Sequence, residues 1–118
     1  MDDDDGITLI TCSGISNTGK LTTKTGEMLM RRSPGMIEHC ISCRADPDRL
    51  RDALSHAEKI AVLDGCTDCC GRKKVREQGY EPEIHFIATE SGIVKNGMEE
   101  PRFDEIEHLT LVVREKLR

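Results

Sequence analysis

The hydrophobic positions of this chain alternate between short apolar runs and runs with helical spacing. Four short runs are typical of strands, the second being the weakest: 7–11, 36–40, 59–63 and 83–89. Four longer segments have the spacing or the end signals of helices: 21–29, 47–57, 68–78 and 103–117. This alternation predicts a small three-layer α/β domain with a mainly parallel sheet of about four strands and flanking helices.

The predicted core is aliphatic, because the chain has no Trp, one Tyr and two Phe. Asp46 is a suitable N-cap for the second helix, and Pro47 suits its first helical position. In the last helix the acidic residues come early and the basic residues late, as the helix macrodipole favours. The apolar face of that helix is expected to consist of Phe103, Ile106, Leu109, Val113 and Leu117.

The charge and the hydropathy of the chain argue against nucleic-acid binding, membrane insertion and secretion. The net charge of −5 argues against a nucleic-acid-binding surface, which needs a basic face. No apolar run approaches the roughly 18 residues of a membrane span, and the acidic start of the chain is unlike a signal peptide. We therefore expect a disordered acidic leader over residues 1–6, one α/β domain over residues 7–118, and a cytoplasmic protein with no membrane partner.

Six cysteines are the most informative feature of so short a chain: Cys12, Cys40, Cys43, Cys66, Cys69 and Cys70. In a chain without a secretory signal they favour metal binding or redox chemistry over structural disulfides. Cys12, Cys40 and Cys66 come at the ends of three predicted strands, and Cys70 lies in the first turn of the next helix. Because parallel strands end at one edge of a sheet, these four thiols are expected to converge there.

Four converging thiolates suit Zn²⁺, which prefers tetrahedral sulfur ligands, and they suit iron as well. A helix N-terminus before Cys70 favours the thiolate charge. Cys43 and Cys69 leave alternatives open, because the pairs 40/43 and 66/69 form a C-x2-C array typical of zinc ribbons. Buried free thiols and a reversible disulfide are the remaining interpretations.

The segment Val62–Lys74 contains Asp64-Gly65-Cys66 and then Cys70 after three residues. It resembles the central motif of the DGC-domain family, a family of bacteria and archaea named for Asp-Gly-Cys and identified with zinc binding. In that family the motif follows a strand and precedes basic positions, as the segment does here.

Three further segments are similar to the family pattern: the loop at 12–19, the pair Cys40-Ile41 and the stretch at 91–95. The resemblance covers roughly residues 7–96, and it implies four chelating cysteines, which match Cys12, Cys40, Cys66 and Cys70. The chain departs from the pattern by its extra thiols at Cys43 and Cys69.

We therefore expect a zinc-binding protein that holds one metal ion at the carboxyl edge of its sheet with Cys12, Cys40, Cys66 and Cys70. A closed four-thiolate site has no open coordination position, which favours a structural metal over a hydrolase. The alternative is a cytoplasmic thiol-disulfide redox protein that uses the cluster at 66, 69 and 70. None of the four histidines is an expected ligand, and Asp64 is expected to accept backbone hydrogen bonds.

Overall fold

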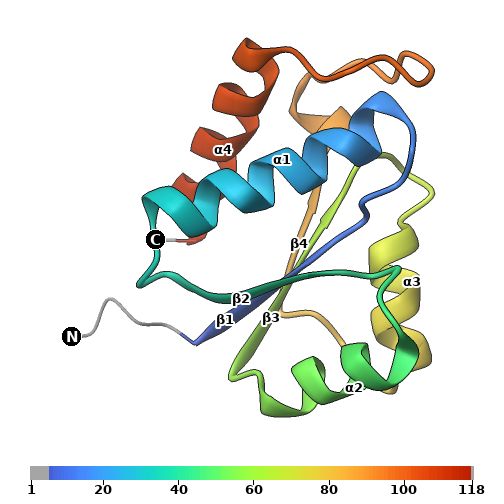
Figure 1. The fold of residues 1–118 in the computed structure, drawn as a ribbon, viewed down its shortest axis with the longest axis vertical. Helices are drawn as coiled ribbons and strands as arrows, with labels where there is room; N and C mark the ends of the chain where they lie inside the picture. Colours follow the sequence, from blue (N-terminus) through green and yellow to red (C-terminus); the bar gives the residue numbers. More distant parts are fainter. Residues whose placement is uncertain (1–5, 118) are drawn as a thin grey trace.

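The computed structural model describes residues 6–117, and its sheet has four parallel strands in the order β2-β1-β3-β4 (Figure 1). The strands are β1 (Ile7–Thr11), β2 (Ile37–Ser42), β3 (Lys59–Asp64) and β4 (Ile84–Ile87). The helices are α1 (Asn17–Arg32), α2 (Pro47–His56), α3 (Cys70–Glu77) and α4 (Phe103–Leu117), with a 3-10 helix, η1, at Ala88–Ser91. The predicted α/β fold with a parallel sheet is confirmed.

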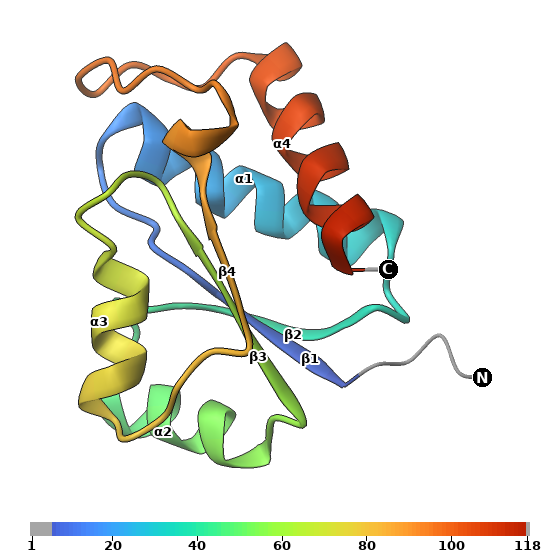
Figure 2. The ribbon, with the colours of Figure 1, turned by 180° about the vertical axis from the view of Figure 1, so that it is seen from behind.

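Helices cover both faces of this sheet, so the fold has three layers (Figures 1 and 2). On the face covered by α1 and α4, the buried side chains include Leu9, Leu29, Leu63 and Leu109. On the face covered by α2 and α3, they include Ile10, Leu54, Val62 and Val75. Both halves of the core are aliphatic, as the composition predicts. Burial of each such side chain contributes roughly 1.5–3 kcal/mol to folding.

Local signals explain where α2 begins. The carboxylate of Asp46 accepts a hydrogen bond from the N–H of Arg49 at 3.4 Å, and Pro47 is the first residue of α2, as predicted. Helix α4 has the predicted bounds and buries Leu109 among others. Phe103 is 68% exposed, so its predicted place on the packed face is wrong, because α4 meets the core only from residue 106 onward.

Strand β2 extends further than its mixed polarity predicts. The sequence indicated a strand over 36–40, but pairing with β1 continues until Ser42 lies opposite Thr11. Cys40 is therefore inside the strand, beside Leu9, and the expectation that it ends the strand is wrong. Cys43, and not Cys40, follows the carboxyl end of β2.

The predicted acidic leader lies outside the described residues, except for Gly6. Gly6 is buried and has a φ of 65°, a conformation that glycine adopts without steric cost. The division of the chain into a leader and a domain stays a prediction. Among residues 6–117, none of the helices combines the length and the apolar character needed to cross a membrane.

The chain order creates a switch point between β1 and β3. Helix α1 leads from β1 across one face to β2, and α3 leads from β3 across the other face to β4. The loops after β1 and β3 therefore lie side by side at one end of the sheet (Figures 1 and 2). A Cβ atom on Gly65 would lie 2.8 Å from the carbonyl carbon of Thr18, so only glycine permits this approach. Open α/β sheets bind ligands at such points.

Candidate metal centre

Two buried thiols follow the ends of β1 and β2. Cys12 is 8% exposed, and its N–H donates to the carbonyl of Leu63 in β3 at 3.0 Å. Cys43 is 2% exposed, and its N–H donates to the carbonyl of Thr11 at 2.8 Å. The Cys43 thiol also donates to the carbonyl oxygen of Cys12, with Sγ 3.5 Å from the oxygen. These contacts hold the two cysteines at the same level of the sheet edge.

Three more thiols come from the turn between β3 and α3. Cys66 lies two residues after the end of β3, and its carbonyl accepts a hydrogen bond from the N–H of Cys69 at 3.1 Å. Cys69 has φ 53° and ψ 48°, the left-handed conformation, which costs a residue with a side chain roughly 1–2 kcal/mol. Cys70 is the first residue of α3. The turn therefore supplies three thiols to the edge that holds Cys12 and Cys43.

Cys12, Cys43 and Cys70 are close enough for the charge of one thiolate to affect the protonation of another. Burial raises the pKa of Cys43 to about 11, and the negative charge of Cys12 and Cys70 adds to this effect. Burial also raises the pKa of Cys70, again with a contribution from Cys12. The guanidinium of Arg44 opposes both increases in pKa, and its Nε donates to the Cys12 carbonyl at 3.3 Å. A divalent cation would stabilise the same thiolates far more strongly than one guanidinium does.

The sulfur of Cys66 contacts the positively charged side chain of Lys95. The ammonium group of Lys95 donates to Cys66 Sγ at 3.5 Å and lies 3.9 Å from a carboxylate oxygen of Asp68. The hydrogen bond to Cys66 is the main cause that raises the pKa of Lys95. In the sequence, Lys95 is notable only as part of the stretch at 91–95 that is similar to the family pattern. The structure adds its contact with a thiol.

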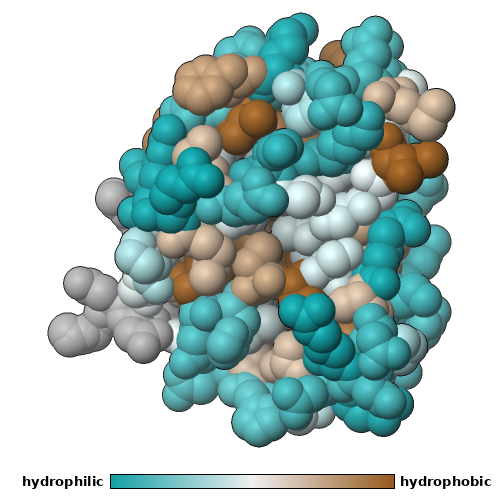
Figure 3. All heavy atoms as spheres, viewed as in Figure 1, coloured by the Kyte–Doolittle hydropathy of each residue, from teal (hydrophilic) through white to brown (hydrophobic). Residues whose placement is uncertain are grey.

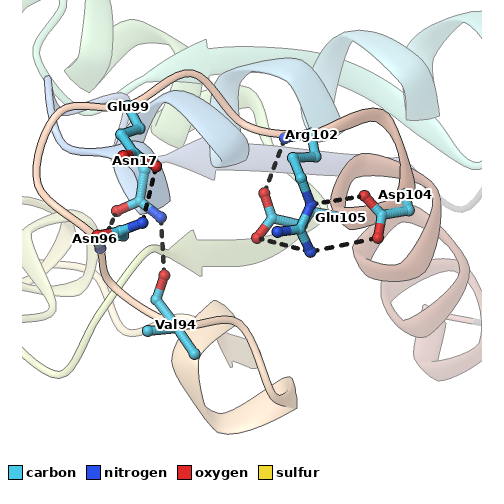
Figure 4. Close-up of polar contacts among 7 residues, drawn as sticks. All are labelled: Asn17, Val94, Asn96, Glu99, Arg102, Asp104 and Glu105. Atoms are coloured by element: carbon cyan, nitrogen blue, oxygen red, sulfur yellow. Dashed lines mark hydrogen bonds and ion pairs between the residues drawn. The ribbon is translucent and has the colours of Figure 1, made fainter.

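Asn17 holds the loop that carries Lys95 (Figure 4). Its side-chain Nδ2 donates to the carbonyl of Val94 at 2.8 Å, and its Oδ1 accepts from the N–H of Asn96 at 2.6 Å. These two partners are the neighbours of Lys95 in the chain. Asn17 is the first residue of α1 and is 5% exposed, so the contact joins the N-terminus of α1 to the loop.

Cys40 lies away from this group of thiols. It packs with the core under α1, and a Cβ atom on Gly26 of α1 would lie 2.7 Å from Cys40 Sγ. It lines a groove of about 400 Å³ beside α1 together with Thr11, Ser13 and Ser42, and Figure 3 shows a pale hollow in this region, below α1. Burial, followed by the charge of Glu27, raises its pKa to about 11. The structure therefore places Cys12, Cys66 and Cys70 on the loops after β1 and β3 and at the start of α3, and Cys40 inside β2 under α1.

A buried carboxylate organises the start of α3. Asp64 is fully buried, and its two oxygens accept hydrogen bonds from the N–H groups of Gly71 at 2.7 Å and Arg72 at 3.3 Å. The prediction that Asp64 accepts backbone hydrogen bonds is confirmed. One of its oxygens also lies 2.7 Å from Nε2 of His85 in β4.

Asp64, Cys69 and His85 form a group of side chains close enough to hold a metal ion. One ligand atom from each lies within 4.8 Å of the other two. The sequence did not predict His85 as a ligand, because its contact with Asp64 depends on β3 and β4 being neighbours. Its one signal was its position between Ile84 and Phe86 of the last strand, where it stands out as a polar residue.

A known family model matches nearly the whole chain. A family model described as the DGC domain matches residues 8–113, a range that includes all six cysteines and both Asp64 and His85. No curated protein and no solved structure matches the chain. Since the family match extends over nearly the whole length, the chain belongs to the DGC-domain family.

Proposed function

We propose that this chain is a zinc-binding protein that holds one Zn²⁺ at the carboxyl edge of its sheet. The ligands are the thiolates of Cys12, Cys66 and Cys70, with Cys43 as the fourth. The observation that carries the proposal is that cysteines follow the ends of three neighbouring strands and begin the helix after one of them, at the end of the sheet that holds the switch point. Tetrahedral sulfur coordination is the commonest structural use of zinc in proteins.

We choose Cys43 as the fourth ligand because it follows the end of β2, as Cys12 follows the end of β1. It donates to the Cys12 carbonyl and shares an electrostatic field with Cys12 and Cys70. Cys40, which the resemblance matches to the fourth ligand, comes three residues earlier, about 10 Å back along an extended strand. It also contacts α1, whereas Cys43 packs on the opposite face of the sheet with residues of α2 and α3.

The ion would join parts of the chain that are far apart in sequence. One zinc on these four thiols links the ends of β1, β2 and β3 to the first turn of α3. Such a link stabilises the folded state, because a site of this kind does not exist in the unfolded chain. All six cysteines are free thiols in the structure, and a reducing compartment such as the cytoplasm keeps thiols in this metal-binding form.

Removal of each ligand tests the proposal. We expect Cys12→Ser, Cys66→Ser and Cys70→Ser each to lower the zinc affinity by about 100-fold or more, because a hydroxyl is a poor substitute for a thiolate. The affinity is measured by competition with a chelator under anaerobic conditions. Ser42→Ala, a change next to Cys43 that removes no thiol, is the matched control and should bind zinc as the wild-type chain does. Unchanged affinity in all three cysteine variants would overturn the proposal.

A further inference from the structure

Asp64, Cys69 and His85 are a second set of ligating side chains that the four-thiol site does not use. Their ligand atoms lie within 4.8 Å of one another. Around a tetrahedral zinc ion, neighbouring nitrogen, oxygen and sulfur ligands are separated by about 3.3–3.8 Å, given metal–ligand bonds of about 2.0–2.3 Å. Small shifts of side chains therefore suffice to place all three on one ion.

Backbone hydrogen bonds fix the Asp64 side chain and the backbone of Cys69. The N–H groups of Gly71 and Arg72 fix the buried Asp64 carboxylate through the first turn of α3. Cys69 is fixed by a turn to the Cys66 carbonyl and by its own carbonyl, which accepts the N–H of Lys73 at 3.0 Å. Its left-handed backbone is maintained at a conformational cost, and such residues concentrate at functional sites.

His85 supplies a nitrogen atom as the third ligand of this group. Its Nε2 lies 2.7 Å from the Asp64 oxygen, and its side chain is 19% exposed. A cation between the two groups replaces the hydrogen of that contact, which requires the nitrogen and oxygen to separate to about 3.3 Å. Imidazole, thiolate and carboxylate are all ligands that zinc accepts.

We propose that Asp64, Cys69 and His85 form a second zinc site, distinct from the four-thiol site and open at one coordination position. Three protein ligands leave the fourth position of a tetrahedral ion to water or to an incoming ligand, as in zinc sites that carry out chemistry. The four-thiol site is closed by comparison. The two sites use different side chains and meet at the turn between β3 and α3.

The number of zinc ions per chain tests this proposal and separates it from the four-thiol site. The wild-type chain, His85→Ala, Cys69→Ala and Cys12→Ser are stripped of metal, titrated with Zn²⁺ under anaerobic conditions and counted by native mass spectrometry. We expect two ions for the wild-type chain and one for each of the three variants. His39→Ala, which removes an exposed histidine of β2, is the control and should keep two ions.

Two other patterns would each overturn one of the two sites. One ion on the wild-type chain, His85→Ala and Cys69→Ala, with none on Cys12→Ser, overturns the second site and leaves the four-thiol site intact. One ion on the wild-type chain and Cys12→Ser, with none on His85→Ala, supports the second site and overturns the proposed four-thiol function. Circular dichroism of each stripped variant identifies any loss of fold, and Cys69→Ala then decides if His85→Ala does not fold.

Discussion

The thiol of Cys43 donates to the carbonyl oxygen of Cys12, with 3.5 Å between Sγ and the oxygen. This contact joins residues 31 positions apart in the chain, and it brings the end of β2 to the end of β1. It also distinguishes Cys43 from Cys40, which packs under α1.

The pair Cys43→Ala and Cys40→Ala tests which thiol of β2 completes the four-thiol site. We expect Cys43→Ala to lower zinc affinity by about 100-fold or more, because it removes a ligand. We expect Cys40→Ala to keep the affinity, since that thiol lies inside β2 and packs under α1 beside Gly26. Chelator competition measures both variants. The reverse result would assign the fourth ligand to Cys40.

Zinc affinity should rise steeply with pH. Zinc binds thiolates, but burial raises the pKa of Cys43 to about 11 and also raises the pKa of Cys70. Both thiols are therefore protonated at neutral pH in the metal-free chain, and zinc must displace their protons. Each displaced proton makes affinity rise about tenfold per pH unit, so Cys43 and Cys70 by themselves contribute about 100-fold per pH unit. Competition titrations at several pH values between 6.5 and 8.5 measure this slope, and an affinity independent of pH would contradict it.

The metal-free chain should lose stability in alkaline solution. The pKa values of Cys40 and Cys43 are raised from 9.0 to about 11 in the folded chain. A raised pKa means that the folded chain keeps these protons more tightly than the unfolded chain does. Their contribution to stability is therefore complete below pH 9.0 and is lost as the pH rises towards 11. Urea unfolding across this range measures the loss, and the double variant Cys40→Ala with Cys43→Ala should show a smaller pH dependence than the wild-type chain.

Lys95 should act on the metal through Cys66. Lys95→Gln removes the ammonium group that donates to Cys66 Sγ, and we expect zinc affinity to fall by about 10-fold, the range for groups that hydrogen-bond to a ligand. Lys74→Gln, which removes an exposed lysine of α3, is the control. Asn17→Ala should weaken zinc binding in the same direction, since Asn17 holds both chain neighbours of Lys95. Equal affinities for Lys95→Gln and Lys74→Gln would show that Lys95 does not affect zinc binding through Cys66.

Gly65 should tolerate no side chain. A Cβ atom there would lie 2.8 Å from the carbonyl carbon of Thr18, and backbone must move to relieve the contact. We expect Gly65→Ala to lower the free energy of unfolding by about 2 kcal/mol, as overpacking does. Gly14→Ala is a milder change in the neighbouring loop, because its nearest contact is the flexible end of Arg44 at 3.2 Å. Urea denaturation compares the two, and an equal effect would show that the contact with Thr18 is unimportant.

The sequence predicted the elements whose signals are local. Strand β1 is a continuous apolar run, and its bounds at 7–11 were predicted correctly. The start of α2 followed from Asp46 and Pro47. The end of β2 was missed, because β2 is an edge strand with exposed Glu38 and His39, so its polarity resembles that of a loop.

The sequence predicted that Cys12 and Cys66 follow strand ends, but it did not predict the contacts that depend on strand pairing. Cys12 and Cys66 follow strands that apolar runs identify, and parallel order brings those ends together. The contact of Asp64 with His85 needs β3 and β4 to be neighbours in one register, Asp64 beside Ile87. No periodicity in the sequence contains that information. The same holds for Asn17, whose partners on the loop are 77 or more positions away.

Anaerobic native mass spectrometry of the purified chain tests the central claim most directly, because it reports bound metal and oxidised cysteines in one spectrum. The account predicts a chain that carries zinc and keeps all six cysteines reduced. A chain that carries no metal and contains one or more disulfides would contradict the account and would assign these thiols to redox chemistry instead.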